Sequence, residues 1–325
     1  MKPFSFSKSD KVSKALVAKK EAVQFLAGGT NLVDLMKKNI AVPDGLIDIT
    51  AVLSDKVESI NGNTRIGAMV RNSALANDPQ ILAKHPLVAK AVLAGASPQI
   101  RNMASTAGNL LQRTRCPYFY ETSAPCNKRK PGSGCSALHG EQRMSAIIGY
   151  NEQCVAVHPS DLCVALAALG ATVNVTDKGN KQLTIPFKDF HKLPESTPEL
   201  DNHLPKDAII TSVDIPDNPF NKHFAYLKLR DRDSYAFALV SVAAALQLEG
   251  NRIKDARLAS GGVAHKPWRW QKAEQYLRGK EANAATFSAA AAIVADEVKP
   301  LPGNGFKKVM LSGAIETALQ NCLTA

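Results

Sequence analysis

The sequence predicts an α+β protein built from two domains. At 325 residues the chain is longer than one average domain. The segment Pro216–Pro219 (PDNP) is the clearest candidate boundary, and it separates residues 1–218 from residues 219–325. Before it, short apolar strands alternate with glycine turns and helical stretches. After it, strand-like segments come first and helical segments follow, an order typical of an α+β domain.

The first lobe, residues 1–52, is predicted to be a compact β–α–β unit. Ser9 is a candidate cap for a short helix, and strands are expected at 23–27 and 45–49. Between the strands, Gly28-Gly29-Thr30-Asn31 runs directly into a helix start. A strand, a glycine turn and a helix N-terminus together present backbone N–H groups to a phosphate. A plain β–α turn with Asn31 as its N-cap is the other interpretation.

The second lobe, residues 53–218, is predicted to combine strands with a largely helical stretch. Strands are expected at 57–60, 65–70, 171–176, 182–185 and 209–215. Helix is expected over 73–95, with interruptions near Pro79 and Pro86. A second loop, 95–110, again contains small residues with Ser, Thr and Asn donors. Two such loops in one domain are suited to clasping the two phosphates of a dinucleotide.

Residues 112–158 form a cysteine-rich insertion directly behind the second loop. It carries Cys116, Cys126, Cys135 and Cys154, separated by nine, eight and eighteen residues. Its prolines and its Gly-Ser-Gly turn exclude a long helix or a central strand. Four thiolates on a tetrahedral zinc or on an iron–sulfur cluster would hold such a segment in place. Two disulfides, or cysteines with no joint role, are the alternatives left open by the spacing.

The C-terminal unit, residues 219–325, is predicted to be a three-stranded antiparallel sheet followed by helices. Strands are expected at 224–229, 238–248 and 253–263, and helices at 270–277, 282–295 and 305–323. Upstream of this unit, residues 158–162 open a helix that runs to Leu169, with Ser160 or Asp161 as its cap. The remaining cysteines, Cys163 and Cys322, look like isolated packing residues.

Charge and hydropathy exclude several classes of protein. Forty Lys and Arg against 29 Asp and Glu give a net charge of +11, but the sequence contains no nucleic-acid-binding motif. No apolar run is long enough to span a bilayer, and the N-terminus lacks the apolar core of a signal peptide. The densest basic cluster flanks the cysteines: Arg113, Arg115, Lys128, Arg129 and Lys130.

Several motifs resemble the flavin subunit of the molybdenum hydroxylase (xanthine dehydrogenase) family. Residues 26–32 (LAGGTNL) resemble its first FAD pyrophosphate loop, and residues 105–110 (STAGNL) resemble the second, with Ala107 where many relatives have glycine. Ser160-Asp161, Lys228 and the segment 233–236 (DSYA) match its remaining flavin contacts. The resemblance implies FAD contacts at Leu26, Ala27, Gly28, Gly29, Thr30, Asn31, Leu32, Gly95, Ala96, Ser105, Thr106, Gly108, Asn109, Leu110, Asp161, Lys228 and Tyr235.

The insertion narrows the resemblance to the periplasmic aldehyde oxidoreductases of bacteria, a small group within the family. It implies a [4Fe–4S] cluster on Cys116, Cys126, Cys135 and Cys154. The implied fold is a two-lobed FAD-binding domain of PCMH type with an iron–sulfur insertion and a C-terminal flavoprotein domain. The implied role is electron transfer from [2Fe–2S] centres of a small subunit through FAD to an external acceptor. A large subunit with a molybdenum cofactor would oxidise the aldehyde, so no catalytic residue is expected in this chain.

Three further expectations follow. The basic cluster would steer an acidic electron carrier such as a ferredoxin, or would hold the insertion on an acidic face of a partner subunit. The heterotrimer would be periplasmic by co-export on a partner's signal, and otherwise cytoplasmic. The rival interpretation from another class is a zinc-stabilised nucleotide-binding or assembly protein without redox chemistry.

Overall fold

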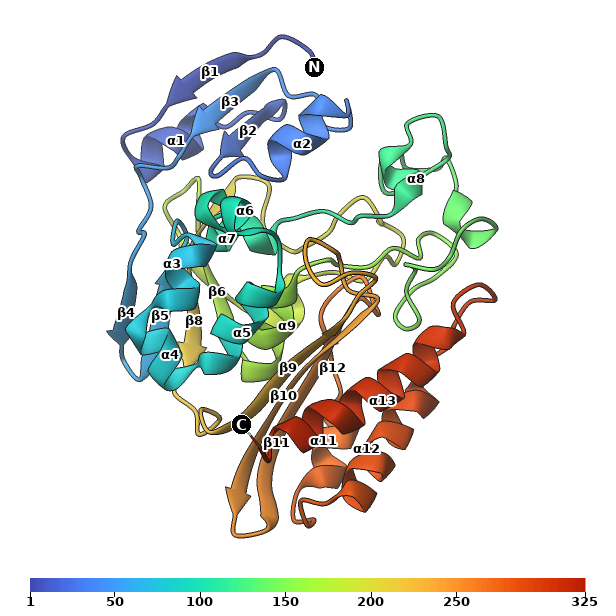
Figure 1. Cartoon of the computed structure of the whole chain (residues 1–325). Helices are drawn as coiled ribbons and strands as arrows, with labels where there is room; N and C mark the ends of the chain where they lie inside the picture. Colours follow the sequence, from blue (N-terminus) through green and yellow to red (C-terminus); the bar gives the residue numbers. More distant parts are fainter. Residues whose placement is uncertain (325) are drawn as a thin grey trace.

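The computed structural model describes residues 1–324, which form two lobes, a cysteine-rich arm and a C-terminal unit (Figure 1). The first lobe contains β1 (Ser5–Lys8), α1 (Val12–Ala18), β2 (Val23–Leu26), α2 (Leu32–Lys37) and β3 (Gly45–Asp48). Its sheet has the order β1-β3-β2, with both pairs parallel. Strand β1 was not predicted, because its four residues are all exposed and show no burial pattern.

Ser9 does not cap α1, so that prediction is wrong. Lys11 occupies the N-cap position without a side-chain bond, and the Ser9 hydroxyl donates to the Lys11 carbonyl. Asn31 does occupy the N-cap position of α2, but its side chain makes no capping bond.

The second lobe is built on a five-stranded antiparallel sheet of order β4-β5-β8-β6-β7. Its strands are β4 (Val57–Ile60), β5 (Asn63–Gly67), β6 (Thr172–Asp177), β7 (Gln182–Pro186) and β8 (Ala208–Pro216). Its helices are α3 (Asn72–Asn77), α4 (Pro79–Lys84), α5 (Pro86–Ala94), α6 (Pro98–Met103), α7 (Thr106–Leu110), α9 (Asp161–Leu169) and α10 (Phe187–Phe190). Proline at the first position of α4 and of α5 divides the helical stretch where the sequence predicts.

Helix α9 is the central element of the second lobe. Every residue from Asp161 to Leu169 is buried, as expected for a helix that is apolar on nearly all sides. The Ser160 hydroxyl accepts a bond from the Cys163 N–H and thereby caps the helix, as the sequence predicts. Helix α9 packs against α5 on one side and against β10 and β11 of the C-terminal unit on the other, so it links the lobe to that unit.

The cysteine-rich arm contains little regular structure, as its proline and glycine content predicts. Its only helical turns are α8 (Pro117–Tyr120) and a 3₁₀ turn, η1 (Ser136–Leu138). Isolated bridges between Cys126 and Cys135, and between Asn151 and Cys154, are the remaining ordered pairings within it. In Figure 1 the arm extends beside the first lobe and above the helices of the C-terminal unit.

The C-terminal unit is a four-stranded antiparallel sheet covered by three helices (Figure 1). Its strands are β9 (His223–Leu229), β10 (Val240–Glu249), β11 (Arg252–Gly261) and β12 (Trp268–Arg269), and its helices are α11 (Gln271–Leu277), α12 (Ala284–Glu297) and α13 (Phe306–Asn321). The predicted three-stranded sheet is wrong by one strand. Strand β12 is only two residues long and shows no sequence periodicity, and it pairs with Ala259 and Ser260 of β11. In the chain described, no helix is long and apolar enough to cross a bilayer.

Candidate functional site

A cavity of about 1160 Å³ lies where the two lobes, the cysteine-rich arm and the C-terminal unit meet. Its volume is slightly above the usual range for small-molecule and cofactor sites, about 300–1,000 Å³, as a ligand of dinucleotide size requires. Its lining includes every predicted FAD contact except Thr106 and Leu110. The side chains of these two residues are buried in the core instead, and the Thr106 hydroxyl donates to the Val70 carbonyl.

The first loop presents unpaired backbone donors to this cavity. Gly28 packs so tightly that an added Cβ would lie 1.8 Å from the Met103 carbonyl oxygen. Gly29 has a φ of +72°, a left-handed conformation that L side chains rarely adopt. Within residues 1–324, the N–H groups from Gly28 to Asn31 donate to no other protein atom. Such a row of free donors at a glycine turn is the arrangement that binds a pyrophosphate.

Asn31 adds an unpaired side-chain donor beside this row. Its Oδ1 accepts a bond from the Arg113 N–H at 3.1 Å, which fixes the orientation of the amide. Its Nδ2 is buried and has no partner in the described chain. Because a buried donor without a partner is costly, this geometry indicates a polar ligand in the cavity.

In the second loop, the backbone N–H groups of residues 106–109 already have partners within the protein. The N–H groups of Thr106 and Ala107 donate to the carbonyls of Val70 and Ala68, and those of Gly108 and Asn109 donate to Ser105. The Asn109 side chain is held by Ser160, whose hydroxyl donates to Oδ1 at 2.5 Å. The backbone N–H groups of residues 106–109 are therefore already bonded within the protein, unlike those of the first loop, and a phosphate contact from this second loop stays a prediction.

Asp161 and Lys228 form a buried ion pair on the wall of the cavity. Lys228 Nζ lies 2.8 Å from Asp161 Oδ2 and 3.0 Å from the Ala94 carbonyl oxygen. The Tyr226 hydroxyl donates to Asp161 Oδ1 at 2.7 Å. Burial and the neighbouring Asp161 carboxylate raise the pKa of Tyr226 well above its usual value, so it stays a donor. Sequence reasoning missed Tyr226, although it precedes Lys228 by two residues on the same face of β9.

Aromatic side chains lie at the mouth of the cavity. Tyr235 is 57% exposed and has a φ of +52°, an uncommon conformation for a bulky residue. The Arg115 guanidinium lies 5.1 Å from the centre of the Phe237 ring, and its Nη1 donates to the Tyr120 hydroxyl at 2.7 Å. Tyr120, Phe237 and Arg115 all line the cavity, and the sequence analysis did not assign them to it.

The four cysteines of the arm lie close together as free thiols. All six cysteines of the chain are unpaired, so the disulfide alternative is not realised. Cys126 and Cys135 face each other in an isolated bridge, and a bond from Cys154 lowers the pKa of the Cys135 thiol to about 6. Burial raises the pKa of Cys116 to about 11, with smaller contributions from Cys126 and Cys135.

Cys135 and Cys154 are near enough for their thiols to hydrogen-bond, but no third thiol of the arm is as close to them as one zinc ion requires. A tetrahedral zinc with bonds of about 2.3 Å holds its sulfur ligands about 3.8 Å apart. Among the residues described, no three of these thiols lie within 4.8 Å of one another. An iron–sulfur cage, which places metal and sulfide between the ligands, needs the wider spacing.

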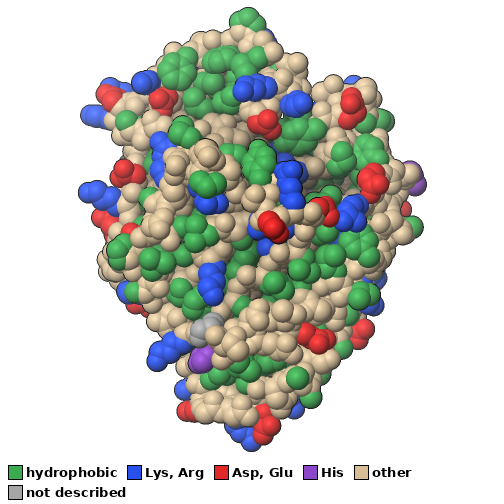
Figure 2. All heavy atoms as spheres, in the orientation of Figure 1, with side chains coloured by type: hydrophobic (Ala, Val, Ile, Leu, Met, Phe, Trp, Pro, Cys, Tyr) green, Lys and Arg blue, Asp and Glu red, His purple; other side chains and the backbone are tan. Residues whose placement is uncertain are grey.

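The basic cluster around the cysteines is not one free cationic surface, although Lys130 is exposed, and the steering of an acidic carrier stays a prediction. Lys128 is 2% exposed and lies 2.6 Å from Asp201, which also pairs with Arg113 at 2.7 Å. Arg129 donates to the carbonyls of Tyr118, Phe119 and Ala124. Over the face drawn in Figure 2, Lys and Arg side chains are interspersed with Asp and Glu.

Comparison with known proteins decides the family. The model for the FAD binding domain in molybdopterin dehydrogenase matches residues 3–218, and that for the CO dehydrogenase flavoprotein C-terminal domain matches residues 224–309. The chain is 44% identical, over 323 residues and 98% of each chain, to the aldehyde oxidoreductase FAD-binding subunit PaoB of Escherichia coli K12. The chain belongs to the FAD-binding subunits of the molybdenum hydroxylase family.

Other members of this family are more distant. The glyceraldehyde dehydrogenase medium chain of Sulfolobus acidocaldarius is 26% identical over 301 residues, covering 91% of this chain and 89% of that one. Reconstituted CO dehydrogenase from Oligotropha carboxidovorans superposes with a TM-score of 0.78 at 19% identity, covering 99% and 98% of the two chains. Quinoline 2-oxidoreductase from Pseudomonas putida 86 superposes with a TM-score of 0.76 at 20% identity, covering 99% of this chain and 98% of that one. The two structures share the fold of this chain, and nothing supports the zinc-protein alternative.

Proposed function

We propose that this chain is the electron-transfer flavoprotein subunit of a molybdenum-dependent aldehyde oxidoreductase. The observation that carries the proposal is the cavity itself, in which both loops, Asp161, Lys228 and Tyr235 meet beside four clustered cysteines. The 44% identity to an aldehyde oxidoreductase subunit over nearly the whole chain supports aldehydes as the substrate class. A partner with a molybdenum cofactor would oxidise the aldehyde, and a [2Fe–2S] partner would deliver the electrons, in a heterotrimer.

The cavity fits FAD on its own geometry. Free N–H groups from Gly28 to Asn31 and the unpaired Asn31 amide suit the pyrophosphate. Asp161, fixed by Tyr226 and Lys228, suits hydroxyl groups of the nucleotide chain, because a carboxylate can accept further bonds. Tyr235 and Phe237 at the mouth suit the flat ring. Bound flavin would supply an acceptor for single electrons that releases one or two.

The arm fits a [4Fe–4S] cluster on Cys116, Cys126, Cys135 and Cys154. The wide spacing of the sulfur atoms supports a cage rather than one ion. A small cavity of about 50 Å³ beside Cys116 shares Arg115, Ser160, Asp161 and Phe237 with the wall of the larger one. Cys116 therefore lies on the side of the arm that faces the flavin cavity. In this position the chain's residues would hold two redox groups close together.

Rapid reduction of the assembled complex by an aldehyde tests this function. Under anaerobic conditions we expect the flavin absorbance to bleach when the aldehyde is added. A complex that contains flavin-free Gly29→Val should still reduce its [2Fe–2S] centres but should fail to reduce an external acceptor. Full acceptor reduction without flavin would show that electrons leave by another route.

A further inference from the structure

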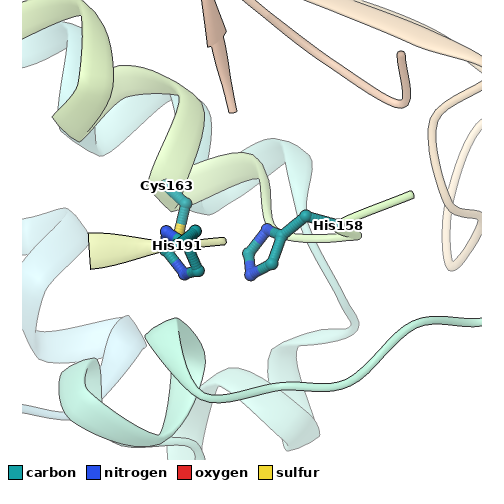
Figure 3. A group of neighbouring side chains, drawn as sticks. All are labelled: His158, Cys163 and His191. Carbon is teal, nitrogen blue, oxygen red and sulfur yellow. The ribbon is translucent and has the colours of Figure 1, made fainter. Parts of the chain in front are cut away.

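A second group of metal-binding side chains lies behind the flavin cavity, separate from the four cysteines of the arm (Figure 3). His158 precedes α9, Cys163 lies in its first turn, and His191 follows α10. Their candidate ligand atoms all lie within 4.8 Å of one another. In the chain from 1 to 324 this is the only group of three His, Cys, Asp or Glu residues at such spacing.

All three side chains are buried, and two ring nitrogens have no partner. His158 is 7%, Cys163 0% and His191 2% exposed. Neither Nε2 of His158 nor Nδ1 of His191 makes a hydrogen bond in the described chain. Unpaired buried polar atoms are uncommon and costly in proteins, so two of them in one cluster with a thiol indicate an absent ligand.

The hydrogen bond on the other side of His191 fixes its tautomer. Its Nε2 lies 2.9 Å from the carbonyl oxygen of Leu110, which can only accept, so Nε2 carries the proton. The lone pair is therefore on Nδ1, the atom without a partner. A histidine that binds a metal through one nitrogen and donates to a backbone carbonyl through the other is the usual arrangement at metal sites. The Ser160 N–H donates to His158 Nδ1 over a long 3.4 Å, so a metal bond through Nε2 of this ring would require that weak hydrogen bond to be given up.

We propose that His158, Cys163 and His191 form a binding site for a closed-shell d¹⁰ cation, with Cu⁺ preferred over Zn²⁺. Thiolate and imidazole ligands together select these ions from the first-row metals. Zinc in proteins takes four ligands, whereas this site offers three. With one thiolate and two neutral imidazoles, Cu⁺ gives a site of zero net charge, while Zn²⁺ leaves an uncompensated charge in a dry interior.

The spacing of the ligand atoms is close to what a three-coordinate ion requires. Bonds of about 2.0–2.3 Å in a trigonal arrangement put neighbouring ligand atoms about 3.8 Å apart. The candidate ligand atoms lie up to 4.8 Å apart, and small rotations about the side-chain bonds of the two histidines and the cysteine can bring them to this distance.

A bound ion would link three segments near the flavin cavity: the second loop, the start of α9 and the segment after α10. His191 holds the end of the second loop through the Leu110 carbonyl. Ser160, between His158 and Cys163, holds Asn109 of the same loop through its hydroxyl. The ion would thus tie the second loop and the start of α9, which carries Asp161, to the segment after α10.

Copper binding to the complete heterotrimeric complex tests the site directly. The complex, with FAD and iron in place, is incubated anaerobically with Cu⁺ buffered by bicinchoninate, or with Zn²⁺, and then desalted. We expect one Cu⁺ per trimer with iron content unchanged, and an X-ray absorption spectrum showing two imidazole nitrogens and one sulfur. Cys163→Ala and His191→Phe should each lose this equivalent of copper and leave the iron content unaltered.

Cys322→Ala is the matched control, because Cys322 is equally buried but belongs to no group of three ligating side chains in the described residues, and His223 contacts its backbone carbonyl. It should bind copper as the wild type does. Equal copper uptake by Cys163→Ala and Cys322→Ala, or copper that enters only as iron is lost, would overturn the site. Binding of Zn²⁺ alone would overturn the choice of Cu⁺. If His191→Phe fails to assemble, His191→Gln gives the same comparison.

Discussion

Lys128 of the cysteine-rich arm and Asp201 of the second lobe form a buried ion pair, with 2.6 Å between Nζ and Oδ1. Burial alone would raise the pKa of Asp201, but Lys128 and Arg113 outweigh it and lower that pKa to about 2. Lys128 Nζ also donates to the Pro198 carbonyl at 2.8 Å. The basic residues beside the cysteines therefore attach the arm to the lobe, and this anchoring gives the first prediction.

Asp201→Asn should destabilise the protein by about 3 kcal/mol, because it leaves the Lys128 ammonium buried without a counter-charge. The free energy of unfolding in urea measures the loss, and limited proteolysis should show earlier cleavage within 112–158. Asp44→Asn is the matched control, since Asp44 pairs with Lys2 at 2.6 Å on the exposed surface. The loss of unfolding free energy in Asp44→Asn should stay below about 1 kcal/mol. Equal losses in both variants would contradict an anchoring role for Asp201.

Gly29→Val should abolish FAD binding while leaving the iron in place. The branched side chain would be strained at the φ of +72° and would distort the row of N–H donors. Gly62→Val is the control, because Gly62 has a φ of +74° with nothing within 4 Å of an added Cβ, in a hairpin turn outside the cavity lining. Flavin per chain, measured after denaturation, should fall only in the first variant. Retention of stoichiometric FAD by Gly29→Val would exclude this loop as the pyrophosphate site.

The buried Lys307 should make the stability of the protein depend on pH in the alkaline range. It is 0% exposed and donates to the carbonyls of Ser145 and Gly262, and burial lowers its pKa from 10.5 to about 7. Between pH 7 and 10.5 the unfolded chain holds a proton here that the folded chain lacks, so this residue's contribution to stability rises with pH. The free energy of unfolding of Lys307→Met should therefore exceed that of the wild type by most near pH 7, and the difference should shrink towards pH 10. The measurement is urea unfolding across this range.

Lys308→Met is the neighbouring control, because Lys308 is only partly buried. Its free energy of unfolding over the same interval gives the effect of removing a partly buried lysine from the same helix. A difference between Lys307→Met and the wild type that is constant from pH 7 to pH 10 would contradict the lowered pKa of Lys307.

The loops and strands were predictable because their signals are local. A glycine turn between a strand and a helix start, as at Gly28-Gly29, can be read within ten residues, and so can proline at the start of α4 and α5. Proline and glycine content likewise predicted an arm without regular structure. The two missed strands lack such signals, since β1 is wholly exposed and β12 is two residues long.

The environment of individual charges was not predictable, because it depends on distant partners. Lys128-Arg129-Lys130 has the composition of a solvated run, yet Lys128 is buried by Asp201, 73 residues away. Cys163 resembles an isolated packing residue until the fold brings His158 and His191 beside it. Tyr226 could have been found, because the alternation of β9 places it on the face of Lys228.

We propose that this chain holds an iron–sulfur cluster on Cys116, Cys126, Cys135 and Cys154 in addition to FAD. Low-temperature EPR of the dithionite-reduced complex, together with iron and zinc analysis, tests it most directly in the wild type, Cys154→Ser and Cys322→Ser. We expect Cys154→Ser to lose one iron–sulfur signal and about four iron atoms per trimer while it keeps its flavin. Cys322→Ser should match the wild type. Identical iron content in all three proteins, or one zinc per chain in the wild type, would contradict the account.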